Sequence, residues 1–323
     1  MKVVKNGPLA ALSSLMFVLA GPASAQEPPE LPEGDTGIAS SYPDDAGIES
    51  HPDVLFADDF EGYSSVGQLT SSGSYDNYYQ GSNLGFDSSI TFSGDQSLRM
   101  RMPATGSEVS NAIVRDLATE QDTIYMRVYG RYQENYAGVN SAHNGLRISG
   151  NYTGPGRRPN GSDFFLVNIE NSKWGSEPEP GYTHAYVYHP EQDDVYGEHW
   201  YSDGRVTNGS QSFGPYFQAR PSRAPARGVW ICYEVLVQLN TPGSRDGRVA
   251  VWVDGELIAD WQNIRFRDTT DLKIDQIQLE NGGQRSSQSN IKWYDSLVIA
   301  RNYIGPASSG NKPNPPENLR STP

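Results

Sequence analysis

Three features of the sequence predict an all-β fold, an antiparallel β-sandwich. Short runs rich in Tyr, Val, Ile and Phe alternate apolar and polar residues, which is typical of strands with one buried face. Clusters of Gly, Asn, Asp and Ser separate these runs, as turns do. Helical periodicity is hard to find, so alternating βα units are not expected.

We expect each clearly alternating run to form a strand. In chain order these runs are Val54–Phe60, Gln96–Met102, Thr123–Tyr132, Gly145–Ser149, Asp163–Glu170, His184–His189, Trp230–Leu239, Val249–Val253, Ile274–Glu280 and Ile291–Ala300. The segments Asn240–Gly243 and Asp254-Gly255 have the composition of tight turns between the later strands. So many strands without a confident helix predict two stacked antiparallel sheets.

The two ends of the chain differ in composition from its centre. Residues 1–25 have the order of a signal peptide, with Lys2 and Lys5, then an apolar run, then small residues before the expected cleavage point. Residues 26–50 and 307–323 are rich in Pro, Gly, Ser and polar or acidic residues, which predicts a disordered acidic leader and a disordered tail or linker stub. We therefore expect the sandwich over residues 51–306 of a secreted or periplasmic bacterial protein.

Charge and cysteine content exclude several classes of partner. The formal net charge of -14 disfavours nucleic acid and anionic lipid. No later segment approaches the ~20 apolar residues of a membrane-spanning helix, so we expect no membrane insertion. The single cysteine, Cys232, lies in an apolar run, and we expect it to be buried in a monomer without an internal disulfide. An acidic polysaccharide stays allowed, because a few arginines can reverse the charge of one cleft.

Strand alternation also sorts polar side chains onto one face. In Thr123–Tyr132, for example, Ile124, Met126 and Val128 suit a core, and the residues between them suit a wet face. If the strands share one sheet, their polar faces form one surface made of Arg127, Tyr129, Arg131, His143, Arg147, Asn168, Glu170, His184, Tyr186, Tyr188, Glu234 and Gln238.

Such a surface suits a sugar polymer. Aromatic rings stack on the C–H faces of sugars, and Arg can hold a uronate carboxylate through two parallel hydrogen bonds. The alternative is an ordinary solvated sheet face, but such a face favours Lys, Glu and Thr over Tyr and Arg.

Two segments resemble a known family. The segment from Arg227 to Pro306, which includes RGVWICYEVLVQLNTPG and IKWYDSLVIA, resembles the C-terminal half of family 14 polysaccharide lyases, secreted enzymes that act on alginate and related polyuronates. Tyr186-Val187-Tyr188-His189-Pro190 is similar to the strand that carries the catalytic tyrosines of that family. The resemblance implies a concanavalin A-like jelly roll and makes Tyr186 and Tyr188 candidate catalytic residues. The family's lysine has no counterpart in AHNGLRISGNYTG, which offers His143 and Arg147 instead.

The chemistry that the resemblance implies is β-elimination from a uronate. It needs a group that neutralises the C6 carboxylate, a base for the C5 proton and an acid for the leaving oxygen. Arg147 or Arg127 would neutralise the carboxylate, Tyr188 or His143 would take the proton, and Tyr186 would donate one. No cofactor is required.

Two other functions stay open. A carbohydrate-binding or extracellular matrix protein could use the same surface without cutting the polymer, because fold does not decide function. A glycoside hydrolase needs two carboxylates flanking the scissile bond, and Glu170 with Glu234 is the candidate pair on the polar faces. The compact glutamate motif of many hydrolases of this fold is missing, so we rank hydrolysis below elimination.

A structural Ca²⁺ site is a separate hypothesis. Asp59 and Glu61 belong to the acidic run Asp58–Glu61 at the first predicted strand, and Asp295 lies on the last. Sandwiches often pair these strands, which would bring together the oxygen ligands that Ca²⁺ prefers. The alternative is an acidic turn without an ion.

Overall fold

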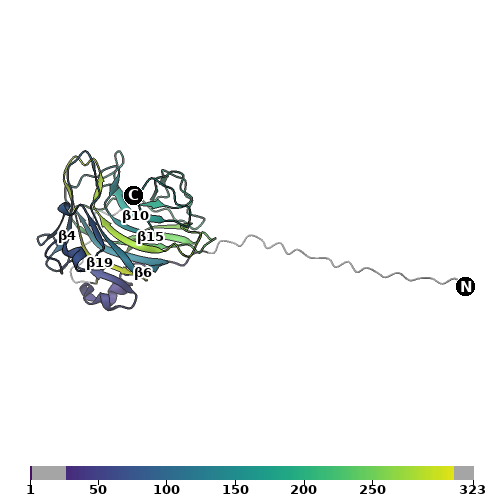
Figure 1. Ribbon diagram of the computed structural model, residues 1–323, viewed down its shortest axis with the longest axis horizontal. Helices are drawn as coiled ribbons and strands as arrows, with labels where there is room; N and C mark the ends of the chain where they lie inside the picture. Colours follow the sequence, from purple (N-terminus) through teal and green to yellow (C-terminus); the bar gives the residue numbers. More distant parts are fainter. Residues whose placement is uncertain (2–26, 309–323) are drawn as a thin grey trace, which may run out of the picture. The chain divides into compact units, whose positions relative to one another are not determined.

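The computed structural model of the protein describes Met1 and residues 27–308 (Figure 1). The predicted signal peptide apart from Met1, and the predicted tail beyond Ser308, lie outside the described residues. The compact unit begins at Leu31, and the described residues of the preceding unit form no helix or strand. No helix among the described residues is long and apolar enough to cross a membrane.

Two large antiparallel sheets form the compact unit. The first, sheet A, runs in the order β16 (Glu256–Ile264), β15 (Gly247–Val253), β14 (Trp230–Gln238), β7 (Thr123–Tyr132), β19 (Asn290–Ala300), β4 (Ser97–Met102) and β3 (Leu84–Asp87), with β1 (Val54–Asp58) also pairing with β19. The second, sheet B, runs in the order β13 (Val206–Thr207), β12 (Glu198–Tyr201), β11 (Tyr182–Tyr188), β10 (Phe165–Ser172), β9 (Leu146–Gly150), β17 (Ile274–Glu280), β6 (Ala112–Gln121) and β2 (Asn77–Tyr79).

The remaining elements are short. A small sheet joins β5 (Glu108–Val109), β18 (Gly282–Gln284) and β8 (Ala142–His143), and the helical turns are η1 (Ile38–Ser41), η2 (Pro43–Asp45), η3 (Ile48–Ser50), α1 (Gln68–Ser71) and η4 (Gly81–Asn83). The long, curved strands dominate Figure 1. The predicted all-β sandwich is confirmed.

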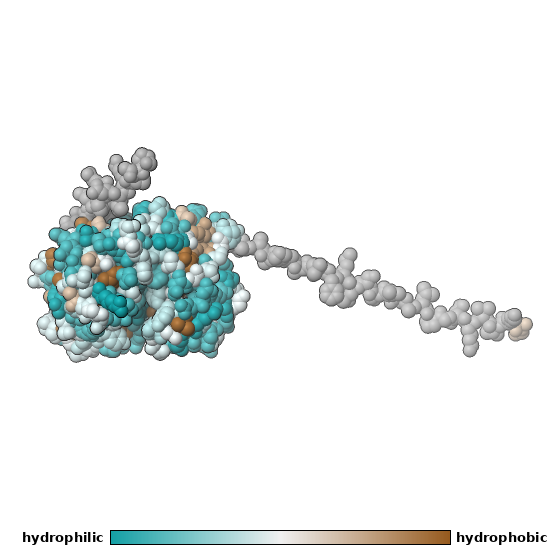
Figure 2. All heavy atoms as spheres, turned by 90° about the horizontal axis from the view of Figure 1, so that it is seen from above, coloured by the Kyte–Doolittle hydropathy of each residue, from teal (hydrophilic) through white to brown (hydrophobic). Residues whose placement is uncertain are grey.

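The core lies between the two sheets and is made by the predicted alternation. Ile124, Met126 and Val128 of β7 share one buried apolar cluster with Ile148 of β9 and Val167 of β10. Hydrophilic residues cover most of the face in Figure 2, where hydrophobic residues form separate spots. Burial of apolar surface between the sheets is the main stabilising contribution, since the lone Cys232 is buried and free.

Strand prediction succeeded where alternation was regular. The ten expected runs coincide with strands to within two residues at each end. The expected turn at Asp254-Gly255 joins β15 to β16, with positive φ angles of 50° and 81° that fit a tight hairpin. The long strand β6 was missed, because its second half, from Arg115 on, is largely exposed and carries no apolar alternation.

The prediction of a disordered leader is wrong for residues 31–50. Ile38, Ala39 and Ile48 are buried in a cluster with Val298 and Ile304, near the other end of the described chain. The backbone N–H groups of Ile38 and Ala39 also donate to the carbonyls of residues 303 and 304. Figure 1 shows these N-terminal turns (purple) beside β19. A few well-placed apolar residues are enough to order this segment, because the sandwich supplies the partner surface.

Glu234 of β14 binds the backbone of residues 304 and 305, near the C-terminal end of the described chain. Its carboxylate is buried and accepts hydrogen bonds from the N–H groups of Ile304 (2.7 Å) and Gly305 (2.9 Å). Burial raises the pKa of Glu234 to about 7, although both N–H groups and the Arg127 guanidinium act to lower it. The carboxyl therefore holds its proton more tightly in the folded state than in the unfolded chain.

This raised pKa predicts a pH-dependent stability. The contribution of Glu234 is fully present below the unfolded pKa of 4.5 and is lost as pH rises through about 7. Because each pKa unit corresponds to ~1.4 kcal/mol, the loss from this group reaches ~3 kcal/mol. The unfolding free energy of Glu234→Gln, measured with urea at pH 5 and pH 8, should lack this part of its decrease with pH. Glu120→Gln, at an exposed position, should keep the wild-type slope, and equal slopes in all three proteins would contradict the assignment.

Candidate functional site

The outer face of sheet B carries a row of polar side chains that come from five neighbouring strands. The antiparallel register sets Gln278 opposite Arg147, Arg147 opposite Asn168, Asn168 opposite Tyr186, and Tyr186 opposite His199. Residues opposite one another on paired strands project from the same face of a sheet. The row therefore follows directly from strand pairing, and the predicted alternation of β9, β10 and β11 is confirmed.

A pocket of about 340 Å³ opens over this row. We call it the tyrosine pocket; its lining includes His143, Arg147, Tyr152, Tyr186, Tyr188, Gln278 and Glu280. The structure thus brings together all four residues that the sequence nominated for catalysis.

Arg147 is held beside the pocket by Glu280 of β17. Its Nη2 lies 2.6 Å from Oε1 of Glu280, and its buried Nε has no hydrogen-bond partner among the described residues. Asn168 connects this ion pair to a second one, because its Nδ2 donates to Glu280 (2.9 Å) and to Glu170 (3.0 Å). The guanidinium is oriented by one carboxylate and keeps an unused donor.

His143 and Glu170 form the second pair. Nδ1 of His143 lies 3.1 Å from Oε2 of Glu170, and the His143 side chain keeps an exposed fraction of 28%. Burial alone would raise the pKa of Glu170, but the charges and hydrogen bonds of His143 and His184 outweigh it and lower the pKa to about 2. Burial likewise acts to lower the pKa of His143, and the Glu170 carboxylate outweighs it, so that this pKa is raised. Because Nδ1 faces a carboxylate, Nε2 is the ring nitrogen left for a substrate.

The two predicted tyrosines are coupled to each other. The Tyr186 hydroxyl donates to that of Tyr188 at 3.1 Å and accepts from the N–H of Gly197 at 3.2 Å. Tyr186 is half-buried, whereas Tyr188 is fully buried and packs with Phe164 and Leu166. Burial raises the pKa of both phenols, so both are neutral at ordinary pH. Tyr186 is the member of the pair nearer to solvent.

Sequence reasoning missed Glu280, Tyr152 and His199. Glu280 belongs to a strand with clear alternation, in which Gln276, Gln278 and Glu280 share one face, so the signal was present. Tyr152 follows β9 in a loop, and His199 lies on the four-residue strand β12. Neither position has enough surrounding pattern to reveal which way its side chain points.

Five nominated residues lie on the other sheet, so the expectation of one shared surface is wrong for them. Arg127, Tyr129 and Arg131 are on β7, and Glu234 and Gln238 are on β14 of sheet A. Alternation assigns faces within a strand and does not say which sheet the strand joins.

Three of these five residues bind segments near the two ends of the described compact unit. The buried Arg127 lies 2.6 Å from Asp45 of η2, and the Tyr129 hydroxyl accepts from the N–H of Ala307 at 2.8 Å. Together with Glu234, these contacts use the polar face of sheet A within the protein. Arg127 is therefore not available to neutralise a substrate in the tyrosine pocket.

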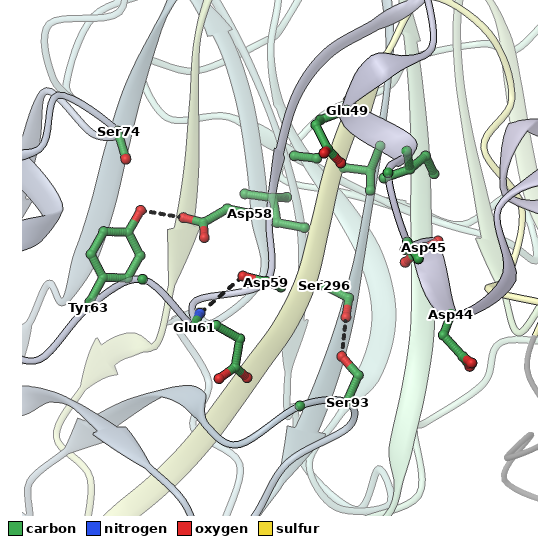
Figure 3. A pocket seen from close by; sticks show the side chains of 18 of the residues that line it. Asp44, Asp45, Glu49, Asp58, Asp59, Glu61, Tyr63, Ser74, Ser93 and Ser296 are labelled. Carbon is green, nitrogen blue, oxygen red and sulfur yellow. Dashed lines mark hydrogen bonds between the residues drawn. The ribbon is translucent and has the colours of Figure 1, made fainter.

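The nominated calcium ligands lie near a second pocket, of about 680 Å³, which includes Asp59 and Glu61 in its lining (Figure 3). The expected pairing of the first and last strands is confirmed, since β1 pairs with β19. Backbone N–H groups already donate to all three carboxylates: Glu61 accepts from Asp95 and Gln96, Asp295 accepts from Phe92 and Ser93, and Asp59 accepts from Glu61. The calcium site stays a prediction, which the effect of a chelator on the melting temperature would test.

The bridging role of Asn168 predicts a stability effect. Asn168→Ala removes the only amide that donates, within the described residues, to both buried carboxylates Glu170 and Glu280. Glu170 and Glu280 keep His143 and Arg147 as partners, so the variant loses one charge-assisted hydrogen bond at each buried carboxylate, which costs about 2–3 kcal/mol of unfolding free energy in urea denaturation. Asn77→Ala, at an exposed position on β2, should change it by less than about 0.5 kcal/mol. Equal stability of the two variants would show that the bridge contributes nothing.

Comparison with known proteins finds a family model that matches part of the chain. The sequence model described as Polysaccharide lyase 14 matches residues 179–292, which include Tyr186, Tyr188 and Glu280. No protein with curated annotation matches the chain.

Several solved structures share the fold. Alginate lyase Aly36B is 15% identical and superposes with a TM-score of 0.56 over 78% of this chain and 98% of its own. The PL-14 alginate lyase of Aplysia kurodai is 13% identical (TM-score 0.55; 77% and 99%), and alginate lyase vAL-1 from Chlorella virus is 15% identical (TM-score 0.54; 77% and 100%). The protein therefore has the jelly-roll fold of these lyases and, over residues 179–292, the sequence pattern of polysaccharide lyase 14, which supports a polysaccharide lyase.

Proposed function

We propose that the protein is a secreted polyuronate lyase that cuts an acidic polysaccharide by β-elimination in the tyrosine pocket. The observation that carries the proposal is the convergence of Arg147, His143 and Tyr186 on one pocket of sheet B. The match to Polysaccharide lyase 14 over the tyrosine strand supports the same reaction class. Structures of Aly36B variants hold alginate tri- and tetrasaccharides, which favours an anionic polymer for a chain of the same fold.

Arg147 is the group that neutralises the uronate in this proposal. Its Nη2 is held by Glu280, so the guanidinium is oriented before substrate arrives, and its side chain keeps an exposed fraction of 15%. A hydrogen-bonded C6 carboxylate stabilises the negative charge that develops when C5 loses its proton. Positioning of this kind needs no metal or redox cofactor.

His143 is favoured over Tyr188 as the base. Nε2 of neutral His143 carries a lone pair when Nδ1–H donates to Glu170, and this side chain reaches solvent. Tyr188 is buried and has a raised pKa, which disfavours its phenolate. His143 takes the C5 proton, the C–H electrons form the C4–C5 double bond, the C4–O bond breaks, and Tyr186 protonates the leaving oxygen.

Hydrolysis fits the geometry less well. Glu234 lies on sheet A with its carboxylate bound to backbone N–H groups, so it cannot face Glu170 across a glycosidic bond. Glu170 and Glu280 approach the same amide of Asn168, but Glu170 is paired with His143 and Glu280 with Arg147. A carboxylate with a pKa of about 2, such as Glu170, does not hold the proton that a general acid must donate.

A non-catalytic carbohydrate-binding protein is the second candidate, because the lysine of the resembling lyases has no counterpart in the Gly-rich strand. Incubation with alginate, glucuronan, pectin, ulvan and neutral glucans distinguishes a lyase from a non-catalytic binding protein. A lyase produces an unsaturated end that absorbs in the ultraviolet, whereas a binding protein retains a polymer and gives no product over long incubation.

Substitutions in the pocket test the assigned roles. His143→Ala and Tyr186→Phe should each lower kcat by about 100-fold or more, because each removes a proton-transfer group. Arg147→Ala should lower kcat/KM by a similar factor, since it removes the group that stabilises the developing charge. Initial rates of ultraviolet absorbance on the polymer that the wild type cuts provide the measurement.

Arg223→Ala is the matched control. This arginine pairs with Glu256 away from the tyrosine pocket, and its loss should leave the rate within about twofold of wild type. Full activity of His143→Ala would make Tyr188 the base in place of His143. Full activity of Arg147→Ala would contradict the proposed mechanism.

A further inference from the structure

A cluster of two histidines and one glutamate lies beside the tyrosine pocket, and the proposed reaction uses only its glutamate, Glu170, as the partner of His143. Ligand atoms of Glu170, His184 and His199 all lie within 4.8 Å of one another. The register of sheet B creates this cluster, because Glu170 lies opposite His184 on β11, and His199 lies on the next strand, β12.

The backbone fixes which nitrogen of His184 faces the cluster. Its Nδ1 lies 3.0 Å from the carbonyl oxygen of Tyr182, and a carbonyl can only accept, so Nδ1 carries the hydrogen. In neutral His184 the lone pair is then on Nε2, which lies 3.4 Å from Oε1 of Glu170 and 3.0 Å from Nδ1 of His199. A histidine that binds a metal through one ring nitrogen characteristically donates a hydrogen bond from the N–H of the other, as His184 does here.

The same geometry sets two acceptors against each other. Oε1 of Glu170 and Nε2 of His184 are both fully buried, and although Nδ1–H of His199 can donate to the Nε2 lone pair, a positive charge between Nε2 and Oε1 is what would make their contact attractive. A proton on Nε2 would supply that charge, and so would a cation bound by both atoms. His199, which is half-buried, provides a third ligand and an approach from solvent.

We propose that Glu170, His184 and His199 bind a divalent transition-metal ion of the Zn²⁺ type. Two imidazoles and one carboxylate suit Zn²⁺, Co²⁺, Ni²⁺ or Cu²⁺ and not the all-oxygen preference of Ca²⁺ or Mg²⁺. Bond lengths of about 2.0–2.2 Å require ligand atoms about 3.3 Å apart, so the observed separations need only small side-chain rotations. Three protein ligands leave a fourth position for water.

Aromatic side chains surround the cluster on two sides. The His184 ring stacks on Tyr201 with centroids 5.0 Å apart, and the His199 ring stacks on Tyr186 at 4.8 Å. An ion would therefore fix His199 against Tyr186 and would share Glu170 with His143. Metal binding would therefore also order side chains of the tyrosine pocket. Metal binding itself does not depend on whether that pocket cuts a uronate.

Titration with metal tests the site directly. Full-chain protein without a histidine tag, stripped with a chelator, should bind one equivalent of Zn²⁺ by calorimetry and melt at a higher temperature when loaded. Co²⁺ in place of Zn²⁺ should give the visible absorption of a low-coordinate nitrogen and oxygen site. His199→Ala should weaken Zn²⁺ binding by about 100-fold or more, and Glu170→Gln provides a second variant of nearly unchanged shape.

Two further histidine variants make the result specific. His51→Ala removes a histidine from outside the cluster and should bind Zn²⁺ as the wild type does. His143→Ala should also keep the metal while losing lyase activity, so the two proposals fail separately. Absence of Zn²⁺ binding by the wild type, or equal affinity in His199→Ala, would overturn the metal site and would leave the proton on His184 as the charge that faces Glu170.

Discussion

The antiparallel register of sheet B is the constraint on which the candidate site depends. Hydrogen bonding between β17, β9, β10, β11 and β12 places one polar residue from each strand in a single row, from Gln278 to His199. A shift by one residue in any of these pairings would turn that strand's polar set into the core and its apolar set to solvent. The core of Ile148, Val167 and Val187 therefore fixes the position of the pocket residues above it.

A buried polar network supports the same site from inside the sandwich. Nζ of Lys292, on β19, donates to the carbonyl of Asn144 and to the hydroxyl of Tyr132 at 2.5 and 3.0 Å. The Tyr294 hydroxyl reaches the same carbonyl at 3.2 Å. Because Asn144 follows His143, these bonds tie the segment that carries the proposed base to sheet A. Buried polar groups of this kind specify one arrangement, since each is costly when left unpaired.

The two sheets use their outer polar faces differently. On sheet A the face is covered by chain ends, and Arg127, Tyr129 and Glu234 bind Asp45, Ala307 and the backbone at Ile304. On sheet B the corresponding face lines a pocket, where the Arg147 side chain keeps an exposed fraction of 15%, against 0% for Arg127. The same residue types thus stabilise the fold on one side and are available for a ligand on the other. Which role an arginine takes depends on whether another segment of the chain covers it.

The sequence by itself determined the all-β class, the long regular strands and the faces that carry Arg147, Asn168 and Tyr186, because alternation within a strand depends only on neighbouring residues. Together with the family resemblance, it also nominated His143, Arg147, Tyr186 and Tyr188 for one candidate site. Tertiary structure decided what depends on long-range pairing: the assignment of β7 and β14 to the other sheet, the ordering of residues 31–50, and the recruitment of Glu280 and His199. No local pattern encodes these features, because strand partners far apart in sequence are chosen by the burial and hydrogen bonding of the whole sandwich.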